Sequence, residues 1–581
     1  MGCTLSDDVF PYRADYYPII GQLLHEMNVA EKVNRVVEAD EAQANIDVGT
    51  FVCLMIHNLL GDVNIRLYRM QEFFQDKALP LMIPWKPDVN LDEINDDRAA
   101  RVLDVVWKAD PQKVFSVVAN QAVRLHVLDT SIIHGDTTSK SFQGTFDNMD
   151  GHMLTPLVTY GYSKDHRPDL KQLVFGVGTT ADGIPILAEV ADGNSSDKTL
   201  NGRWVKNLRS VLGKDIQEFL LYVADSSLVT TPNLCLMAKY HIDFISRLPG
   251  TFDIEEELKR KAFQEDNWEY IGKVSEDKHA AVYHSCEMSG DIEGKTYRFV
   301  VLQSDRKDKR KVKALDRTVQ KEREGLKEKV KKLRTRAFAC RRDAEIEQEK
   351  FFHGCNPRYH LFEWDIEERQ EKVKRNKQGR PRKDEEPCFQ TWYYLNGEVH
   401  LNEEVYEKEQ GLCGLFVLVT SLMDREYYSA KSILERYKGQ GSVERIFKFI
   451  KNPSWVGSFC LKKPGRIAAL GYIVLIAAMI YTLWERRVRK ALAGEEASPI
   501  LGLDKKKTKK PTTYALQIVL SSILVLTQKI KGERHIWLPK PLNPNQKRVL
   551  KLSGFDEGIY FLGERRVEKK ISQSDMGGCG M

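Results

Sequence analysis

The spacing of apolar residues along this 581-residue chain changes near residue 126, which divides an expected helical part from an expected sheet. Over residues 15–125, apolar side chains recur every three or four positions, a spacing typical of amphipathic helices. The segment Asn95-Asp96-Asp97 precedes one of these runs and predicts a helix N-cap. We therefore predict an all-helical domain over residues 1–125.

From residue 126, short β-type runs separated by Gly-containing loops replace the helical spacing. The runs LHVLDTSIIHGD, KQLVFGVGTTA and GIPILAEVADG predict three strands. The segments SDKTLNGRWVKNLRSVLG, EFLLYVAD, TPNLCLMAKYH and IDFISRL then predict helix, strand, helix and strand. This order indicates an α/β domain over residues 126–251, with a mixed sheet covered by helices.

Residues 252–412 break that order and are interpreted as an α+β insertion domain. Two strands, AAVYHSCEM and KTYRFVVLQS, precede one long basic helix over residues 305–350, and TWYYLNGEVHL predicts a hairpin that turns on Asn396-Gly397. The basic helix has an apolar stripe that indicates a coiled-coil-like arm. Its members are Val312, Leu315, Val319, Leu326, Val330, Leu333 and Ala337.

The rest of the chain is predicted to be mainly helical. Residues 413–495 hold the strand GLFVLVTS, a helix around YKGQGSVERIFKFIK and the uncharged run IAALGYIVLIAAMIYTLW. That run is as long as a membrane span, but its Ala and Gly content favours a helix buried on a sheet. Residues 496–581 are predicted to be a helical tail with a Lys-rich linker, LDKKKTKKP, and a final helix TYALQIVLSSILVLTQKI.

The charge of the chain is concentrated in one place. The net charge is +6, yet residues 305–342 hold 17 Lys and Arg against 6 Asp and Glu. A concentrated basic element on a nearly neutral body is typical of a protein that contacts a phosphate backbone.

Three acidic residues lie at positions where a metal-binding site is expected. Asp136 and Asp225 each follow an apolar strand, and Glu444 lies in a segment rich in cations and aromatic residues. A strand-end Asp is usually a turn or cap residue, and an acid on a basic helix is usually an ion pair. At the expected elements of one sheet and its covering helix, however, the three together predict a site with hard oxygen ligands for Mg²⁺.

These segments resemble the DDE transposases of prokaryotic insertion sequences. The resemblance rests on HGDTTS, GYSKDHRPDLKQLVFGVGTTADGIPILAEVADGNSSD, VADSSL and YKGQGSVERIFKFIK. It points to the subgroup with a Y-R-E-K signature (Tyr, Arg, Glu and Lys separated by two, three and six residues) and a large insertion before the catalytic Glu. The resemblance implies a ribonuclease-H-like core.

By that resemblance, Asp136, Asp225 and Glu444 are the catalytic and metal-binding triad, with Asp129 the rival for the first place. The signature falls on Tyr437, Gln440, Glu444 and Lys451, and the resemblance implies that Tyr437 and Lys451 hold the DNA backbone at the element end. Gln440 replaces the Arg of the pattern, and Lys438 or Arg445 is expected to supply the missing contact. On one helix, the four signature positions would share a face. Further candidate DNA contacts are Arg380 and Arg382, in the loop QGRPRK, which is also compatible with an ordinary charged loop.

The resemblance implies a DNA transposase that uses two Mg²⁺ ions, with Mn²⁺ as a substitute. Its partners would be double-stranded DNA, as terminal inverted repeats and as target DNA, and a second copy of the chain. The expected location is the cytoplasm, in association with the nucleoid. No membrane partner is expected, although the start MGCTLS fits a lipidation pattern.

Several alternatives stay open. The N-terminal domain fits either packing and dimerisation or recognition of DNA ends. The loop YSKDHRPDLKQ, with Lys164, His166 and Arg167, fits an active-site loop or local packing. The rival functions are a nuclease without strand transfer and a catalytically decayed DNA-binding protein.

Overall fold

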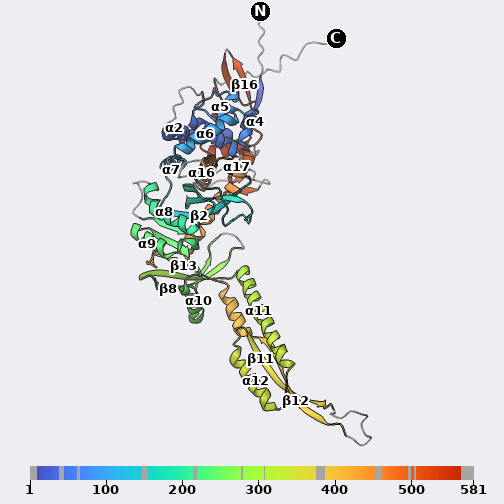
Figure 1. Cartoon of the computed structure of the whole chain (residues 1–581). Coiled ribbons are helices and arrows are strands. Elements are labelled where there is room, and N and C mark those ends of the chain that lie inside the picture. Colours follow the sequence, from blue (N-terminus) through green and yellow to red (C-terminus); the bar gives the residue numbers. More distant parts are fainter. Residues whose placement is uncertain are drawn as a thin grey trace, which may run out of the picture. The chain divides into compact units, whose positions relative to one another are not determined.

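The computed structural model describes residues 9–37, 45–61, 66–144, 146, 155–212, 219–275, 279–306, 308–374, 386–451, 461–494, 499–502, 506–530 and 532–563 (Figure 1). The chain divides into two compact units. Unit 1 combines Met1–Ser246 with Glu435–Met581, and unit 2 is Arg247–Leu434. The loop QGRPRK, with Arg380 and Arg382, and the start MGCTLS lie outside the described residues.

The N-terminal part of unit 1 is mainly helical, which confirms the helices predicted from apolar spacing, but the prediction that it is all-helical is wrong. Its helices are α1 (Tyr17–Glu26), α2 (Val29–Val37), α3 (Val48–Leu59), α4 (Met70–Phe74), α5 (Leu79–Met82), α6 (Asp96–Lys108) and α7 (Pro111–His126). The Asn95 side chain accepts a hydrogen bond from the Arg98 N–H, so the predicted N-cap of α6 is confirmed. A strand that the sequence analysis did not predict, β1 (Phe10–Arg13), precedes α1.

The sheet of unit 1 follows the predicted order of elements. Its strands are β2 (Ile132–Phe142), β3 (Lys171–Thr180), β4 (Pro185–Ala191), β5 (Leu221–Ala224) and β6 (Asp243–Arg247), and its crossover helices are α8 (Asp197–Leu212) and α9 (Thr231–Tyr240). In space the strands lie in the order β4-β3-β2-β5-β6. The pairs β2/β3 and β3/β4 are antiparallel, whereas β2/β5 and β5/β6 are parallel, so the sheet is mixed.

Helices cover both faces of this sheet. On one face lies α16 (Pro464–Gly494), where a Cβ on Gly471 would stand 2.8 Å from the Phe175 ring, so that glycine allows close packing. The Tyr472 hydroxyl of α16 accepts a hydrogen bond from the Val190 N–H. On the other face, Trp204 of α8 packs against Gly176. Helix α16 is long and apolar enough to cross a membrane, but 89% of its most apolar window is buried in the protein, as predicted.

The C-terminal part of unit 1 corrects the predicted helical tail. It holds β14 (Ile500–Leu501), β15 (Lys507–Thr508), α17 (Thr513–Leu520), β16 (Leu524–Ile530), β17 (Glu533–Trp537) and α18 (Pro544–Leu552). The expected helix over residues 513–530 stops at Leu520 because Ser522 adopts a left-handed backbone conformation, with φ of 69°. Strand β16 then pairs with β1 and β17.

Unit 2 contains an antiparallel sheet with the order β13-β9-β8-β7. Its strands are β7 (Glu269–Lys273), β8 (Val282–Ile292), β9 (Lys295–Ser304) and β13 (Leu415–Thr420), and two further helices of the unit are α10 (Asp253–Glu265) and α13 (Glu403–Leu412). The predicted strands AAVYHSCEM, KTYRFVVLQS and GLFVLVTS correspond to β8, β9 and β13 and are confirmed.

The basic part of unit 2 corrects three predictions. The expected helix over residues 305–350 is two helices, α11 (Lys309–Arg334) and α12 (Arg341–Gly354), separated by β10 (Ala337–Phe338). The predicted hairpin on Asn396-Gly397 is wrong, because β12 (Phe389–Leu401) runs straight through it and pairs with β11 (His360–Lys372). Helix α11 lies beside β12 (Figure 1). Val319, Leu326 and Val330 of its apolar stripe are buried, so the stripe packs within the unit rather than forming a coiled-coil-like arm.

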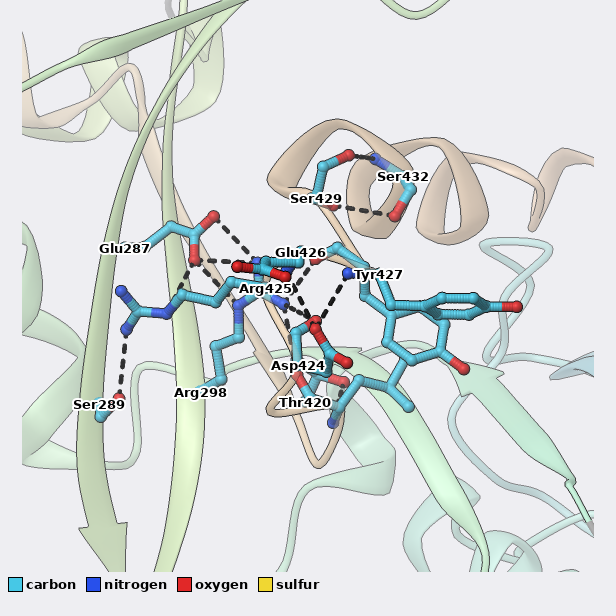
Figure 2. A network of polar contacts seen from close by, with 12 residues as sticks. Glu287, Ser289, Arg298, Thr420, Asp424, Arg425, Glu426, Tyr427, Ser429 and Ser432 are labelled. Carbon is cyan, nitrogen blue, oxygen red and sulfur yellow. Dashed lines mark hydrogen bonds and ion pairs between the residues drawn. The ribbon is translucent and has the colours of Figure 1, made fainter.

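A network of ion pairs and hydrogen bonds fixes the segment between β13 and α14 (Ala430–Lys438) (Figure 2). The Arg298 side chain is fully buried and forms two hydrogen bonds of 2.9 Å to the Glu287 carboxylate. Its Nη1 donates to the carbonyl of Tyr428 at 2.6 Å and lies 3.4 Å and 3.5 Å from those of Leu422 and Asp424. Glu287 also pairs with Arg425 at 3.4 Å. This buried cation therefore uses its N–H groups on protein acceptors.

Candidate active site

Asp136 and Asp225 lie on adjacent parallel strands of the unit 1 sheet. The register of β2 and β5 pairs Gly135 with Ala224, so each aspartate stands one residue beyond this pair, Asp136 within β2 and Asp225 directly after β5. The prediction that Asp136 follows a strand is wrong, because β2 continues to Phe142 and is held there by its antiparallel pairing with β3. Asp225 directly follows β5, as predicted. The structure thus brings these two predicted site residues together.

Each of the two carboxylates uses only one oxygen in its contacts with described residues. Asp136 Oδ1 accepts from the Thr137 N–H at 2.7 Å and lies 4.0 Å from Lys164 Nζ. Asp225 Oδ1 accepts from the Ser227 N–H at 3.0 Å and from its hydroxyl at 2.5 Å. No described residue donates to Oδ2 of either aspartate. Oxygens of this kind are the ligands that divalent hard cations take.

The electrostatics of Asp136 also fit a cation site. Burial raises the pKa of Asp136 to about 7, with further increases from the neighbouring charges of Asp225 and Asp197. Lys164 and the Thr137 N–H act in the opposite direction. Since carboxylates bind a cation in their charged form, a bound divalent ion would displace the proton that Asp136 holds near neutral pH.

Asp197 and Thr137 belong to the site, although the sequence analysis did not single them out. The Thr137 hydroxyl donates to Asp197 Oδ1 at 2.5 Å, and Lys164 Nζ pairs with Asp197 Oδ2 at 2.9 Å. Lys164 Nζ also donates to the Thr137 carbonyl at 2.7 Å. Asp197 lies in the first turn of α8, where an acid is ordinary, so only the three-dimensional contacts reveal its place.

The loop YSKDHRPDLKQ contributes one of its three noted cations to this cluster. Lys164 lies in the site, whereas His166 is exposed and Arg167 pairs with Asp169 at 2.7 Å on the surface. The loop also reaches α15 (Gly441–Lys451), because Asp165 forms an ion pair of 2.5 Å with Lys451. Of the three, only Lys164 lies beside Asp136 and Asp197, and the active-site interpretation of this loop stays a prediction.

The predicted single helix around Glu444 is two helices. Helix α14 ends at Lys438 and α15 begins at Gly441, so Tyr437 and Lys438 belong to α14 and Gln440 to the turn. Gly439 at this break packs closely on His134 of β2. The four signature positions consequently do not share one continuous helical face, and Gln440 Nε2 is buried without a hydrogen-bond partner among the described residues.

Helix α15 packs on strands β2 and β3 of the sheet. The Ser442 hydroxyl lies 2.9 Å from that of Thr179 in β3, and Lys140 Nζ in β2 donates to the Ile450 carbonyl at 2.8 Å. Because side chains alternate along a strand, Lys140 and Asp136 project from the same face of β2. Glu444 therefore lies on the part of α15 that passes this face.

Glu444 does not complete a cluster in this structure. Its side chain is exposed, and among the described residues no three His, Cys, Asp or Glu side chains are arranged to hold a metal ion. The structure joins Asp136, Asp225 and Asp197 electrostatically but does not bring in the third predicted ligand. The triad and the DNA contacts of Arg445 and Lys451 stay predictions.

The rival for the first carboxylate has a structural explanation. Asp129 is exposed before the start of β2, and its Oδ1 accepts a hydrogen bond from the Ser131 N–H at 2.9 Å. This is an ordinary Asx turn. Because this hydrogen bond is local and does not involve the site residues, geometry favours Asp136.

Comparison with known proteins identifies two families along the chain. Residues 149–480 match the family model described as the transposase DDE domain, and residues 11–120 match a domain of unknown function (DUF4277). Asp225 and Glu444 fall inside the transposase match, and Asp136 precedes it. No curated protein matches the chain. A cryo-EM structure of a piggyBac transposase synaptic complex with hairpin DNA is similar over 87% of this chain and 79% of that chain, at 10% identity and a TM-score of 0.35.

Proposed function

The chain belongs to the transposase DDE domain family, and from this premise we propose that it cuts DNA at the ends of a mobile element and joins the freed 3′ ends to target DNA. The observation that carries the proposal is the pair Asp136 and Asp225 on neighbouring strands, each with an oxygen that no described residue uses. We propose further that the element is a prokaryotic insertion sequence of the Y-R-E-K group.

A ribonuclease-H-like core is the fold that we propose for the catalytic part. The strand order β4-β3-β2-β5-β6, with three antiparallel strands followed by two parallel ones, supports it. Unit 2 stands in the sequence between β6 and α15, as an insertion before the third carboxylate would.

Asp136 and Asp225, with Glu444 as the third ligand, are proposed to hold two Mg²⁺ ions, for which Mn²⁺ can substitute. Asp136 and Asp225 fit hard divalent cations, because each has a carboxylate oxygen to which no described residue donates. When bound, such ions stabilise the charge that develops on the attacking and leaving oxygens of an in-line phosphodiester displacement.

The remaining residues of the site orient its ligands and the substrate. Lys164 holds the Thr137 carbonyl and Asp197, and thereby limits the movement of the β2 backbone beside Asp136. In each chemical step the oxygen of water or of a 3′-hydroxyl attacks phosphorus, and the bond from phosphorus to the leaving oxygen breaks. Tyr437, Lys438, Arg445 and Lys451 are proposed to contact the DNA backbone near this bond.

The proposed partners are duplex DNA and a second copy of the chain. Two element ends have to be held together for concerted joining, which a homodimer does with one active site for each end. The basic stretch over residues 305–342 is proposed as a further backbone contact. The expected location is the nucleoid of a prokaryotic cell.

Replacement of the third carboxylate tests the function. We expect Glu444→Gln to lose Mg²⁺-dependent cleavage of a duplex that contains the element end by at least about a thousandfold, since removal of several kcal/mol of transition-state stabilisation costs about tenfold for each 1.4 kcal/mol. Binding of the same duplex should change less than about threefold, measured by fluorescence anisotropy.

The matched control is Glu435→Gln, an exposed glutamate on α14 whose loss should leave cleavage unchanged. Full cleavage by Glu444→Gln would exclude Glu444 as a ligand. Binding without metal-dependent cleavage by the wild-type chain would favour a decayed DNA-binding protein, and cleavage without joining to a target plasmid would favour a simple nuclease.

A further inference from the structure

A cavity of about 720 Å³ lies beside the C-terminal half of α16 in unit 1. Six cationic side chains and two carboxylates line it, so it carries an excess of four positive charges. Its cations come from three segments of the chain and are Arg445, Arg486, Arg489, Lys490, Lys509 and Lys510. Lys509 and Lys510 belong to the Lys-rich linker that the proposed catalytic site does not use. We call this site the basic cavity.

The two carboxylates of the basic cavity position its arginines. Glu485, whose side chain is 12% exposed, accepts from the Thr513 N–H at 2.9 Å and pairs with Arg489 at 2.9 Å and with Arg445 at 3.4 Å. Asp182 pairs with Arg486 at 2.6 Å. These contacts leave the positive excess in place and hold the guanidinium groups at the cavity wall.

Two of the three lysines that line the cavity form no ion pair in the described part of the chain. Lys490 and Lys509 are exposed, and no ion pair is formed by either within the described part of the chain. Burial lowers the pKa of Arg489, and the positive charge of Arg445 lowers it further, although Glu485 counteracts both effects. Six cations that line one cavity, with an excess of four positive charges, favour a polyanionic ligand that neutralises them.

The basic cavity adjoins α15, the helix that carries Glu444. Arg445 directly follows Glu444 on α15, and its guanidinium reaches the turn between β3 and β4, where a Cβ on Gly183 would lie 2.9 Å from Nη2. From there the lining continues along α16 to Lys510. The lining of the basic cavity therefore begins one residue from Glu444 along α15.

The composition of the cavity lining distinguishes between classes of anion. None of its described lining residues is aromatic, so the cavity offers no ring on which a nucleotide base would stack. Charge contacts of Lys and Arg with phosphates carry no sequence information by themselves. A phosphodiester backbone therefore fits the basic cavity better than a free nucleotide does.

We propose that the basic cavity binds the phosphodiester backbone of duplex DNA adjacent to the bond that is cut or joined. This proposal rests on the transposase function for the identity of the DNA, which is either the element end or the target. The cavity adds a binding site formed by α16 and the Lys-rich linker to the contacts predicted on α14 and α15.

The test compares the full-length double variant Lys490→Gln/Lys509→Gln with Lys540→Gln/Lys551→Gln, a control pair of exposed lysines in unit 1 that do not line the cavity. Binding of an end-containing duplex and of a scrambled duplex is measured over a range of KCl concentrations. If the cavity holds the element end, the salt dependence of binding should weaken in the double variant for both duplexes. The negative slope of log K against log salt should become smaller in magnitude by about 2, roughly one for each phosphate that the variant no longer neutralises. The control pair should retain the wild-type slope.

A target-DNA role gives a different result in the same variants. The slope for the end duplex then stays as in the wild type, while joining of precut ends to a plasmid falls at least about tenfold relative to the control pair. Wild-type slope together with wild-type joining would overturn the proposal, provided that the melting temperatures agree. A wild-type chain that neither cuts nor joins would overturn the proposed function instead, and a reduced slope in the double variant would still support the basic cavity.

Discussion

Two clusters of buried or half-buried charge in this molecule are built in opposite ways. In unit 2, Arg298 is fully buried and donates to the Glu287 carboxylate and to backbone carbonyls, so its hydrogen-bonding capacity is used (Figure 2). In unit 1, Asp136 and Asp225 each use one oxygen and leave the other without a donor among the described residues. The first cluster is internally satisfied and the second is not.

This difference separates a structural role from a functional one. A buried charge with every group paired fixes the backbone around it, here the segment that leads from β13 to α14. A partly buried carboxylate with a free oxygen and acidic neighbours costs stability unless a ligand completes it. The raised pKa of Asp136, about 7, reports that cost.

The largest effect is expected from removal of charge at the unsatisfied cluster. Asp136→Asn and Asp225→Asn should each lower metal-dependent cleavage of an end-containing duplex by at least about a thousandfold, because each removes a proposed metal ligand. The rate of strand nicking on a gel measures this. Asp129→Asn is the matched control, since this exposed aspartate only accepts a hydrogen bond in a turn.

A cleavage defect of Asp129→Asn as large as that of Asp136→Asn would move the first ligand to Asp129. The comparison of satisfied and unsatisfied clusters would then fail for unit 1, because the residue with the free oxygen would not be the functional one.

The next effect concerns the satisfied cluster. Arg298→Met should lower the free energy of unfolding by about 3 to 5 kcal/mol, because loss of one partner leaves Glu287 half-buried with only Arg425 at 3.4 Å. Urea denaturation followed by circular dichroism measures the change. The double variant Arg298→Met/Glu287→Leu should recover part of the loss, since it removes the uncompensated charge as well. A single variant as stable as the wild type would show that the network does not stabilise unit 2.

Much of the fold was predictable because it is encoded locally. The short β-type runs of β2 to β6 and the apolar run of α16 indicated elements that the structure contains. Predictions from short sequence motifs were wrong where pairing with a strand distant in the sequence overrides the local preference. Asn396-Gly397 is a strong turn signal, yet β12 pairs with β11 over its whole length and Gly397 packs under the Trp364 ring.

The candidate site was predictable only in part. Asp136 and Asp225 were predicted from expected strand ends and family resemblance, although β2 continues past Asp136, and their adjacency follows from the parallel register. Asp197 could not be found, since an acid in the first turn of a helix has an ordinary explanation. The shared face of Tyr437, Gln440 and Glu444 assumed one helix, and the glycines around Gln440 allow two.

A smaller effect is expected on the stability of unit 1 as a function of pH. The pKa of Asp136 is raised by burial, from 3.8 to about 7, so this group stabilises the fold below its unfolded pKa and that contribution is lost as pH rises through 7. Asp136→Asn does not titrate. In the presence of a chelator it should therefore be more stable than the wild type at pH 8 by about 1 to 3 kcal/mol, below the full shift because the side chain is 29% exposed.

The advantage of Asp136→Asn should grow from pH 4 to pH 7 and then level off, as measured by chemical denaturation at each pH. If the difference in free energy of unfolding between Asp136→Asn and the wild type did not change with pH, the charge of Asp136 would not destabilise the fold. The contrast between the satisfied and the unsatisfied cluster would then not hold for Asp136.

The smallest effect is expected within one loop that contains both kinds of cation. Lys164 is packed against Thr137 and Asp197, whereas Arg167 pairs with Asp169 on the surface, with the two side chains 50% and 58% exposed. Exposed pairs contribute little because water screens them. Arg167→Gln should thus have the melting temperature of the wild type and a cleavage rate within about twofold of it. Lys164→Gln should lower the cleavage rate at least about tenfold, because the β2 backbone beside Asp136 loses the contact that fixes it. Equal defects in the two variants would mean that this loop acts through its charge on DNA rather than through the packing of Lys164.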